Sequence, residues 1–277
     1  MTAIKRGFVD LPHGQMHYRS AGAGRPFLTL HASPGSSRQL AGLIADFAQT
    51  HRVLAPDTPG NGDSVALFDR EPTIPDLAGA MQRFLDAIGV DTVDLYGSHT
   101  GAAIATELAI LAPSRVNTVV LDGVSQLTPE ELADILDNYA FPFPADRDGA
   151  YLARVFQFCR DQYLFFPWYD RTRVGRRDNG LGSAADLHAW IVEVLKANET
   201  YHLNYRAAFK WQGAERVPLV TRPTLLIAGE NDPLLDSTQA LAALAPDSRY
   251  VALPRFDAPD FATARASAIR DFLAGNT

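Results

Sequence analysis

A histidine stands at the centre of the segment whose residues are best suited to chemistry. In DLYGSHTGAAIA (94–105), Gly97 and Gly101 flank His99 at equal distances. This spacing is typical of a sharp turn that joins a buried strand to a helix and projects its central side chain. An imidazole at that position can accept a proton, donate a hydrogen bond or attack a carbonyl carbon. For Ser98 to take the central place, the turn would have to slip by one residue and lose both glycine positions.

Two carboxylates follow predicted strands and are candidates to orient His99. Asp122 ends VNTVVLD (116–122), and Asp232 lies in the loop of IAGENDP (227–233). The partial positive charge at the start of the helix predicted near Thr100 disfavours an imidazolium. We therefore expect a neutral His99 ring near pH 7, unless one of these carboxylates lies close enough to reverse the effect.

The surrounding elements alternate between strand and helix. Two short strands joined at PHG occupy 7–21, and buried strands follow near 27–30, 51–56, 93–97, 116–122, 224–229 and 249–253. Between them, apolar stripes predict helices over 37–49, 74–88, 100–111, 237–244 and 259–273. This alternation favours a mostly parallel sheet covered on both faces.

The alternation stops at about residue 124. From there to about residue 211 the sequence is helical in pattern and unusually aromatic, as in YLARVFQFCRDQYLFFPWYD (151–170). We expect a helical lid at 124–215, inserted into a core formed by 1–123 and 216–277.

Five motifs in chain order carry a resemblance to a known family. They are LHASPGSS (30–37), APDTPGNGDS (55–64), YGSHTGA (96–102), IAGENDP (227–233) and DAPDFATARASAIRDFL (257–273). Together they resemble the α/β-hydrolase fold superfamily, in the lidded branch with epoxide hydrolases, haloalkane dehalogenases and cofactor-free haloperoxidases. The resemblance implies a doubly wound α/β fold with an inserted helical lid.

The same resemblance implies site residues and two departures. The backbone N–H groups of Thr100 and Ser33 correspond to the oxyanion hole, and Asp232 to the catalytic acid. His31 corresponds to a loop histidine that we expect to be structural. The elbow is atypical because His99 replaces the nucleophile, which argues against epoxide hydrolysis and dehalogenation, since both need an aspartate there. The second departure is VALPRFDAPD (251–260), where the base histidine is missing.

Further candidates lie beside the elbow and in the lid. His202, in ETYHLNYR (199–206), is a candidate for a base supplied from another position in the chain. An aromatic lid on the carboxyl edge of a sheet favours an apolar cavity for a small organic ligand. We expect Ser98, Phe143, Trp168 and Tyr201 to contact that ligand. The run RTRVGRR (171–177) is interpreted as a solvated loop, and His13 and His17 as surface residues.

Composition limits the alternatives. A net charge of −7 over 277 residues argues against nucleic-acid or anionic-membrane partners. The single cysteine, Cys159, excludes an internal disulfide, and we expect it to be buried. No metal-binding cluster or phosphate-binding glycine loop is evident, so we expect no metal and no cofactor. The start lacks an apolar signal core, which favours a cytoplasmic protein.

We therefore predict a hydrolase-like enzyme that acts on an ester or C–C bond of a small, mainly apolar or aromatic carbonyl compound. His99 would be base or nucleophile, beside a backbone oxyanion hole. Two alternatives stay open: a catalytically silent ligand-binding protein, and a cofactor-independent lyase or oxygenase. The oligomeric state is not predicted.

Overall fold

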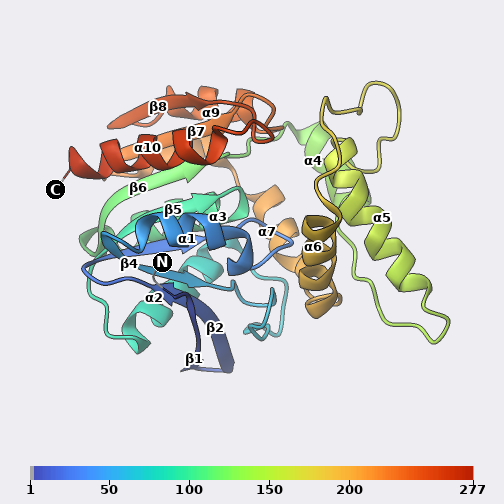
Figure 1. Ribbon diagram of the computed structural model, residues 1–277, viewed down its shortest axis with the longest axis horizontal. Helices are drawn as coiled ribbons and strands as arrows, with labels where there is room; N and C mark the ends of the chain where they lie inside the picture. Colours follow the sequence, from blue (N-terminus) through green and yellow to red (C-terminus); the bar gives the residue numbers. More distant parts are fainter. Residues whose placement is uncertain (1–2, 277) are drawn as a thin grey trace.

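An eight-stranded sheet forms the centre of the computed structural model, which describes residues 3–276 (Figure 1). The order is β1-β2-β4-β3-β5-β6-β7-β8. The pairs β1–β2 and β2–β4 are antiparallel, and all other neighbours are parallel. The strands are β1 (Lys5–Leu11), β2 (Gly14–Ala21), β3 (Arg25–Leu30), β4 (His51–Pro56), β5 (Val93–Ser98), β6 (Val116–Asp122), β7 (Thr224–Gly229) and β8 (Ser248–Leu253).

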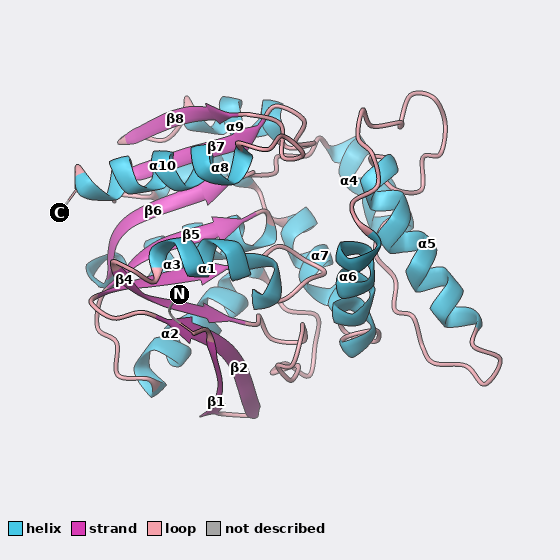
Figure 2. Cartoon of the chain, viewed as in Figure 1, coloured by secondary structure: helices cyan, strands magenta, loops and turns pink. Residues whose placement is uncertain are grey.

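Helices cover both faces of this sheet, as the predicted alternation requires (Figure 2). One buried cluster joins the sheet to α2, α3 and α9, and a second joins it to α1 and α10. These helices are α1 (Ala41–Phe47), α2 (Ile74–Ala87), α3 (Thr100–Leu111), α9 (Leu235–Ala242) and α10 (Phe261–Ala274). The helix predicted over 37–49 is divided, because Ser37–Leu40 forms a 3-10 turn before α1.

Local sequence explains where the helices beside the site begin. The Thr73 hydroxyl accepts from the Asp76 N–H, and the Asp76 carboxylate accepts from the Thr73 N–H, so a full capping box fixes the start of α2. Such a cap stabilises a helix by about 1 kcal/mol. Helix α3 is buried from Thr100 to Ala109 and carries four alanines there, which allow it to lie close against the sheet.

A helical insertion lies between β6 and β7. It contains α4 (Pro129–Asn138), α5 (Ala150–Leu164), α6 (Ala184–Lys196), α7 (Tyr201–Lys210) and α8 (Gly213–Arg216). We call α4–α7 the cap; in Figure 1, α4, α5 and α6 stand to the right of the sheet. A third buried cluster, rich in tyrosine and phenylalanine, belongs to the cap itself.

Helix α7 ties the cap to the core. Asn204 Nδ2 donates to Pro59 O at 3.0 Å and to Asn61 Oδ1 at 2.6 Å. Ala207 and Ala208 belong to the buried cluster under the main sheet. The cap therefore rests on the core through α7, and the other cap helices pack against one another.

Two further findings concern the cysteine and possible membrane-spanning helices. Cys159 is buried in α5, and burial raises the pKa of its thiol to about 12. No helix in residues 3–276 combines the length and the apolar content that a membrane span requires.

Candidate active site

His99 occupies a strained turn between β5 and α3. Its backbone has φ 50° and ψ −110°, and His13 is the only other non-glycine residue in 3–276 with positive φ. Such a conformation costs on the order of 1–3 kcal/mol unless the surroundings hold it. A Cβ at Gly97 would lie 2.1 Å from Gly101 O, and a Cβ at Gly101 would lie 2.3 Å from Leu30 O. Both glycines are therefore sterically required, and the turn is centred on His99.

The His99 ring reaches the loop after β7. Its Nε2 lies 2.9 Å from Asp232 Oδ2, and the two side chains are 35% and 15% exposed. Asp232 is held in turn by the Leu234 N–H, which donates to its Oδ1 at 2.8 Å. No hydrogen bond joins His99 Nδ1 to another residue in the described chain, so this nitrogen is available to a ligand.

The contact between His99 and Asp232 shifts the pKa values of both side chains. Burial disfavours the imidazolium and acts to lower the pKa of His99, but the Asp232 carboxylate and its hydrogen bond outweigh that effect, and the pKa lies above its usual 6.5. Burial acts to raise the pKa of Asp232, and His99 with the Leu234 N–H brings it below its usual value. The sequence predicted a neutral His99 ring unless a carboxylate lay close by. Asp232 is that carboxylate, and it favours the protonated ring.

Two backbone N–H groups lie beside the turn. Thr100 is the first residue of α3, where an N–H has no partner within the helix. Ser33 lies in the loop after β3, and both residues line the same cavity as His99. His31 holds this loop: its Nδ1 lies 2.9 Å from Ala32 O, and its Nε2 accepts from Thr58 N at 2.9 Å.

A cavity of about 310 Å³ lies above the turn, between the sheet and the cap. Core residues form its floor and cap residues its walls. The lining includes Ser33, Gln39, His99, Thr100, Ile135, Tyr139, Gln162, Phe166, Arg177, Trp190, Tyr205, Phe209, Asp232 and Phe256. Its volume suits a small organic molecule.

Residues 25–257 match the alpha/beta hydrolase fold family. The chain belongs to this family. Among curated proteins, this hydrolase is similar to 2-hydroxy-6-oxo-6-phenylhexa-2,4-dienoate hydrolase of Burkholderia cepacia, with 26% identity over 258 residues that cover 88% of this chain and 85% of the other.

Solved structures show the same fold. The enol-lactonase of Burkholderia xenovorans LB400 superposes with a TM-score of 0.74 at 21% identity, covering 97% of this chain and all of the other. Epoxide hydrolase A of Mycobacterium thermoresistibile gives 0.75 at 21% identity, covering 99% of each chain. At these identities the likeness establishes architecture, and the chemistry has to be argued from the site.

Among the described residues, Asp122 forms its side-chain hydrogen bond with Tyr96 rather than with His99, and its charge acts to raise the pKa of His99. Its Oδ2 accepts from Tyr96 OH at 2.6 Å and lies 3.6 Å from Arg265 Nη1 on α10. Burial raises the pKa of Asp122, against the opposing effects of Arg265 and Tyr96. Only its backbone touches the turn, since Asp122 O accepts from His99 N at 3.0 Å. Asp232, rather than Asp122, is therefore the carboxylate that contacts the imidazole.

His202 and Ser98 are also placed apart from the cavity. His202 lies on α7 beside Tyr201, where burial and Arg206 lower its pKa, and it is absent from the lining. Ser98 lies beside the Tyr96 hydroxyl, because alternate residues of a strand share a face. Neither residue therefore lines the cavity that holds His99.

Three predicted contact residues instead form the core of the cap. The Phe143 and Tyr201 rings stack at 5.5 Å, and Tyr201 OH donates to Phe141 O at 2.7 Å. Trp168 Nε1 donates to Tyr139 O at 2.8 Å. None of the three lines the cavity. Their large rings pack the cap helices together, outside the cavity lining where a ligand contact was expected.

Polar cap residues also line the cavity, and sequence reasoning missed two of them, Gln162 and Arg177. Tyr205 OH donates to Gln162 Oε1 at 2.9 Å. Arg177, expected in a solvated loop, donates to Gln162 O at 3.1 Å and to Asn231 O at 3.0 Å. A signal for Gln162 was present, because it continues the helical spacing of Val155, Phe158 and Cys159, which are buried on α5.

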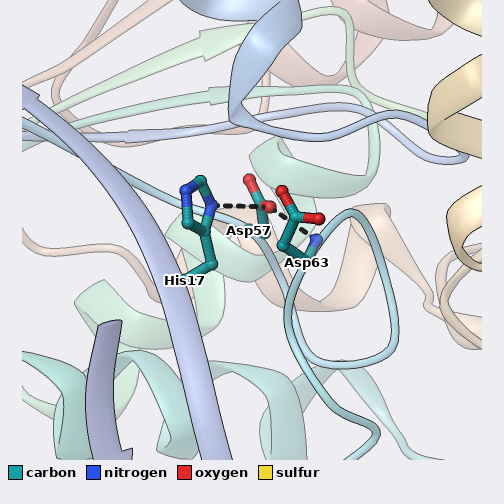
Figure 3. A group of neighbouring side chains, drawn as sticks. All are labelled: His17, Asp57 and Asp63. Atoms are coloured by element: carbon teal, nitrogen blue, oxygen red, sulfur yellow. Dashed lines mark hydrogen bonds and ion pairs between the residues drawn. The ribbon is translucent and has the colours of Figure 1, made fainter. Parts of the chain in front are cut away.

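A separate histidine–carboxylate group lies at the junction of β2 with the loop after β4. His17, Asp57 and Asp63 each offer a possible metal-ligand atom, and these atoms lie within 4.8 Å of one another (Figure 3). His17 is fully buried, contrary to the expected surface position. Its Nδ1 lies 2.9 Å from Asp57 Oδ2, so the ring serves as a partner for a buried carboxylate.

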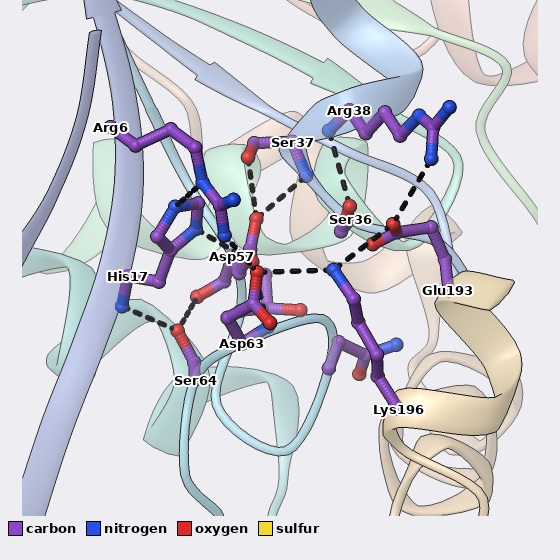
Figure 4. A network of polar contacts seen from close by, with 12 residues as sticks. Arg6, His17, Ser36, Ser37, Arg38, Asp57, Asp63, Ser64, Glu193 and Lys196 are labelled. Atoms are coloured by element: carbon purple, nitrogen blue, oxygen red, sulfur yellow. Dashed lines mark hydrogen bonds and ion pairs between the residues drawn. The ribbon is translucent and has the colours of Figure 1, made fainter. Parts of the chain in front are cut away.

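Protein groups already satisfy this cluster. Asp57 Oδ1 accepts from Ser37 N at 2.8 Å, and Asp63 Oδ2 lies 2.6 Å from Arg6 Nη2 and 3.1 Å from Lys196 Nζ. Figure 4 shows Lys196 of α6 reaching Asp63 across the boundary between cap and core. Two cations and several N–H donors fill the places that a metal ion would need, so we interpret the cluster as a structural junction.

Proposed function

We propose that this alpha/beta hydrolase acts on a small, mainly apolar or aromatic carbonyl compound and that His99 is its general base. The contact between His99 Nε2 and Asp232 carries the proposal. A neutral ring that donates from Nε2 to the carboxylate has its lone pair on Nδ1. That nitrogen has no partner among the described residues, and the ring lines the cavity.

The proposed reaction follows from this tautomer. A water molecule attacks the substrate carbonyl while Nδ1 takes its proton, and Asp232 stabilises the resulting imidazolium. The Ser33 and Thr100 N–H groups bind the oxygen on which negative charge develops. The tetrahedral intermediate then releases an alkoxide or a carbanion, which takes the proton back from Nδ1. Water is added across the cleaved C–O or C–C bond, and no external oxidant or reductant is needed.

The comparison with curated proteins supports the hydrolytic form of this proposal. The Burkholderia cepacia relative is named as a hydrolase of a dienoate that also carries a 6-oxo group. A ketone next to the bond to be broken is the type of carbonyl that this cavity could present to His99. The apolar walls formed by Ile135, Phe166 and Phe209 suit the carbon skeleton of such a compound.

One observation favours a second reaction of the same site. The central residue of the elbow carries no hydroxyl, and its Nδ1 has no hydrogen-bond partner among the described residues. The dyad could therefore take a proton from the substrate itself, as a cofactor-independent lyase or oxygenase would require. Oxygen consumption with an acidic aromatic substrate distinguishes the oxygenase from the hydrolase.

The test compares wild type with His99→Ala on esters, lactones and diketones, with Ser98→Ala as the matched control. Loss of a general base lowers the rate by about 10²- to 10⁴-fold. We expect such a loss for His99→Ala and little change for Ser98→Ala. Equal activity of wild type and His99→Ala would overturn the proposed role. Tight binding without turnover in both would instead identify a silent ligand-binding protein.

A further inference from the structure

The cap end of the cavity presents an amide group that the described chain leaves without a partner. Gln162 is only 9% exposed, and its Oε1 already accepts from Tyr205 OH at 2.9 Å. This bond fixes the amide so that Nε2 is the remaining donor. Nε2 is buried and has no hydrogen-bond partner. Buried donors are normally satisfied, because leaving one unpaired is costly. An acceptor atom is therefore missing from this place.

A second buried donor lies in the same wall. Trp190 Nε1, on α6, also has no partner among the described residues. Gln162 and Trp190 line both the His99 cavity and an outer cavity of about 650 Å³. Both residues therefore lie where the inner and outer cavities meet, and Ser33 and Thr100 line the inner cavity from the core.

The charged groups around this junction already have partners. Arg177 donates to two backbone carbonyls, and burial lowers its pKa while Asp232 acts against that effect. In the outer cavity, Glu193 lies 3.2 Å from Lys196 and 3.8 Å from Arg38. Glu193 Oε2 has no hydrogen-bond donor, whereas Gln162 Nε2 and Trp190 Nε1, which belong to residues lining both cavities, lack an acceptor.

We propose that the substrate carries a second acceptor oxygen, which Gln162 Nε2 and Trp190 Nε1 bind at the cap while its reacting carbonyl lies at His99. The substrate class is then a compound with two separated oxygen functions, such as a diketone, a keto ester or a keto acid. The assignment of the reacting end rests on the proposed function; binding of an oxygen at Gln162 does not.

Three aromatic ketones of similar shape test this inference on the full chain. Acetophenone has one carbonyl, 1,4-diacetylbenzene has a second carbonyl, and 4-acetylbenzoate has a carboxylate at that place. Dissociation constants are measured by calorimetry for wild type and Gln162→Met. Trp190→Phe is the second variant, and it keeps an aromatic ring while removing the donor. Gln39→Met is the matched control, because Gln39 lines both cavities but is exposed.

In wild type, we expect at least one of the two-oxygen compounds to bind on the order of tenfold more tightly than acetophenone. Tighter binding of the diketone assigns a neutral oxygen to the site, and tighter binding of the keto acid assigns a carboxylate. Gln162→Met and Trp190→Phe should each reduce the preference, and Gln39→Met should keep it.

Equal affinities in wild type, binding of none of the three, or a full preference in both variants would overturn the inference. The same titration with His99→Ala separates it from the proposed function. A preference that persists while turnover proves independent of His99 would refute the base and leave the second oxygen site in place.

Discussion

His99 Nε2 lies 2.9 Å from Asp232 Oδ2, although the two residues are 133 positions apart in the chain. In a Ser-His-Asp triad, a separate histidine lies between the nucleophile at the elbow and the acid. Here the stretch 251–260 contains no histidine, and its Phe256 lines the cavity instead. Here His99 lies at the turn and also contacts the Asp232 carboxylate directly, so no second histidine lies between them.

The first prediction concerns the charge of this ring. His99 should titrate above its usual pKa of 6.5 in wild type, and Asp232→Asn should lower that pKa, because the carboxylate is its main stabiliser. NMR of the imidazole C–H signals measures both values, with His99→Gln used to assign the signals. An unchanged pKa in Asp232→Asn would show that the contact does not control the proton.

The shifted pKa values of His99 and Asp232 predict how stability and activity should depend on pH. Since folding raises the pKa of His99, its protonation stabilises the protein below about pH 6.5, and this contribution is lost as pH rises through the folded pKa. The lowered pKa of Asp232 adds stability above about pH 4, which is lost as pH falls. Because the base is the neutral ring, kcat/KM should rise with pH through the His99 pKa.

The second prediction separates the two carboxylates. Asp232→Asn should lower kcat by on the order of 10²-fold or more, because the imidazolium loses its partner. Asp122→Asn should leave kcat within about twofold, because that side chain contacts Tyr96 and Arg265 rather than the ring. Steady-state kinetics on one substrate decides between them, and a larger loss in Asp122→Asn would reverse the assignment.

The third prediction concerns Gly123, which follows β6. A Cβ there would lie 2.7 Å from His99 Cδ2 and Nε2 and 3.3 Å from Asp232 Oδ2. Gly123→Ala should therefore displace the ring and lower kcat by at least about tenfold, since small misplacements of reacting groups are costly.

Gly149 provides the control for backbone strain. It has the same φ of 73°, but a Cβ there would only touch Leu152 at 3.8 Å. Both alanine variants should lose about 1–2 kcal/mol of stability in urea unfolding. Only Gly123→Ala should lose activity, and similar kinetics in the two variants would show that Gly123 does not constrain His99.

The fourth prediction concerns the junction beside β2. Burial opposes ionisation of Asp57, but His17, His31, Ser37 and the Asp63 N–H together hold its pKa well below the usual value. Asp57→Asn should therefore cost about 3 kcal/mol in the free energy of unfolding near pH 7, because it breaks a buried pair. The difference from wild type should begin to shrink as pH falls below about 4 and should disappear only as pH falls through the much lower pKa of folded Asp57.

Asp63→Asn is the matched comparison, because Asp63 is 25% exposed and its pairs with Arg6 and Lys196 are near the surface. It should cost about 1 kcal/mol or less. Equal losses in the two variants would mean that burial of Asp57 is not what makes the junction stable.

Much of the fold and the centre of the site could be predicted from the sequence. The spacing of Gly97 and Gly101 placed His99 in the turn because backbone contact, rather than side-chain chemistry, fixes those two positions. The order of strands and helices followed from periodicity, and α3 was predicted with its observed bounds. Strand ends also placed Asp232 near the elbow, since parallel strands finish at one edge of the sheet.

The cap could not be predicted in the same way. Tyr201 and Tyr205 lie four residues apart on α7, so spacing puts them on one side of the helix. Tyr205 nevertheless lines the cavity, and Tyr201 is sealed in the cap core. The difference depends on how α4, α5 and α6 pack, and no pattern within one helix specifies that. The side-chain contacts of Asp122 could not be predicted for a similar reason. Its place at the end of a strand fixed the backbone, but the contacts with Tyr96 and Arg265 depend on tertiary packing.

The separate buried cluster of the cap has a consequence for how this molecule can diversify. The turn, the acid loop and the N–H donors all belong to the sheet and its loops, while most of the walls around the ligand come from helices that are held together by their own aromatic packing. Substitutions on the inner side of the cap can therefore change which compounds fit without disturbing the proton-transfer groups. Under the proposed function, selectivity and reactivity are carried by different parts of one chain and can vary independently.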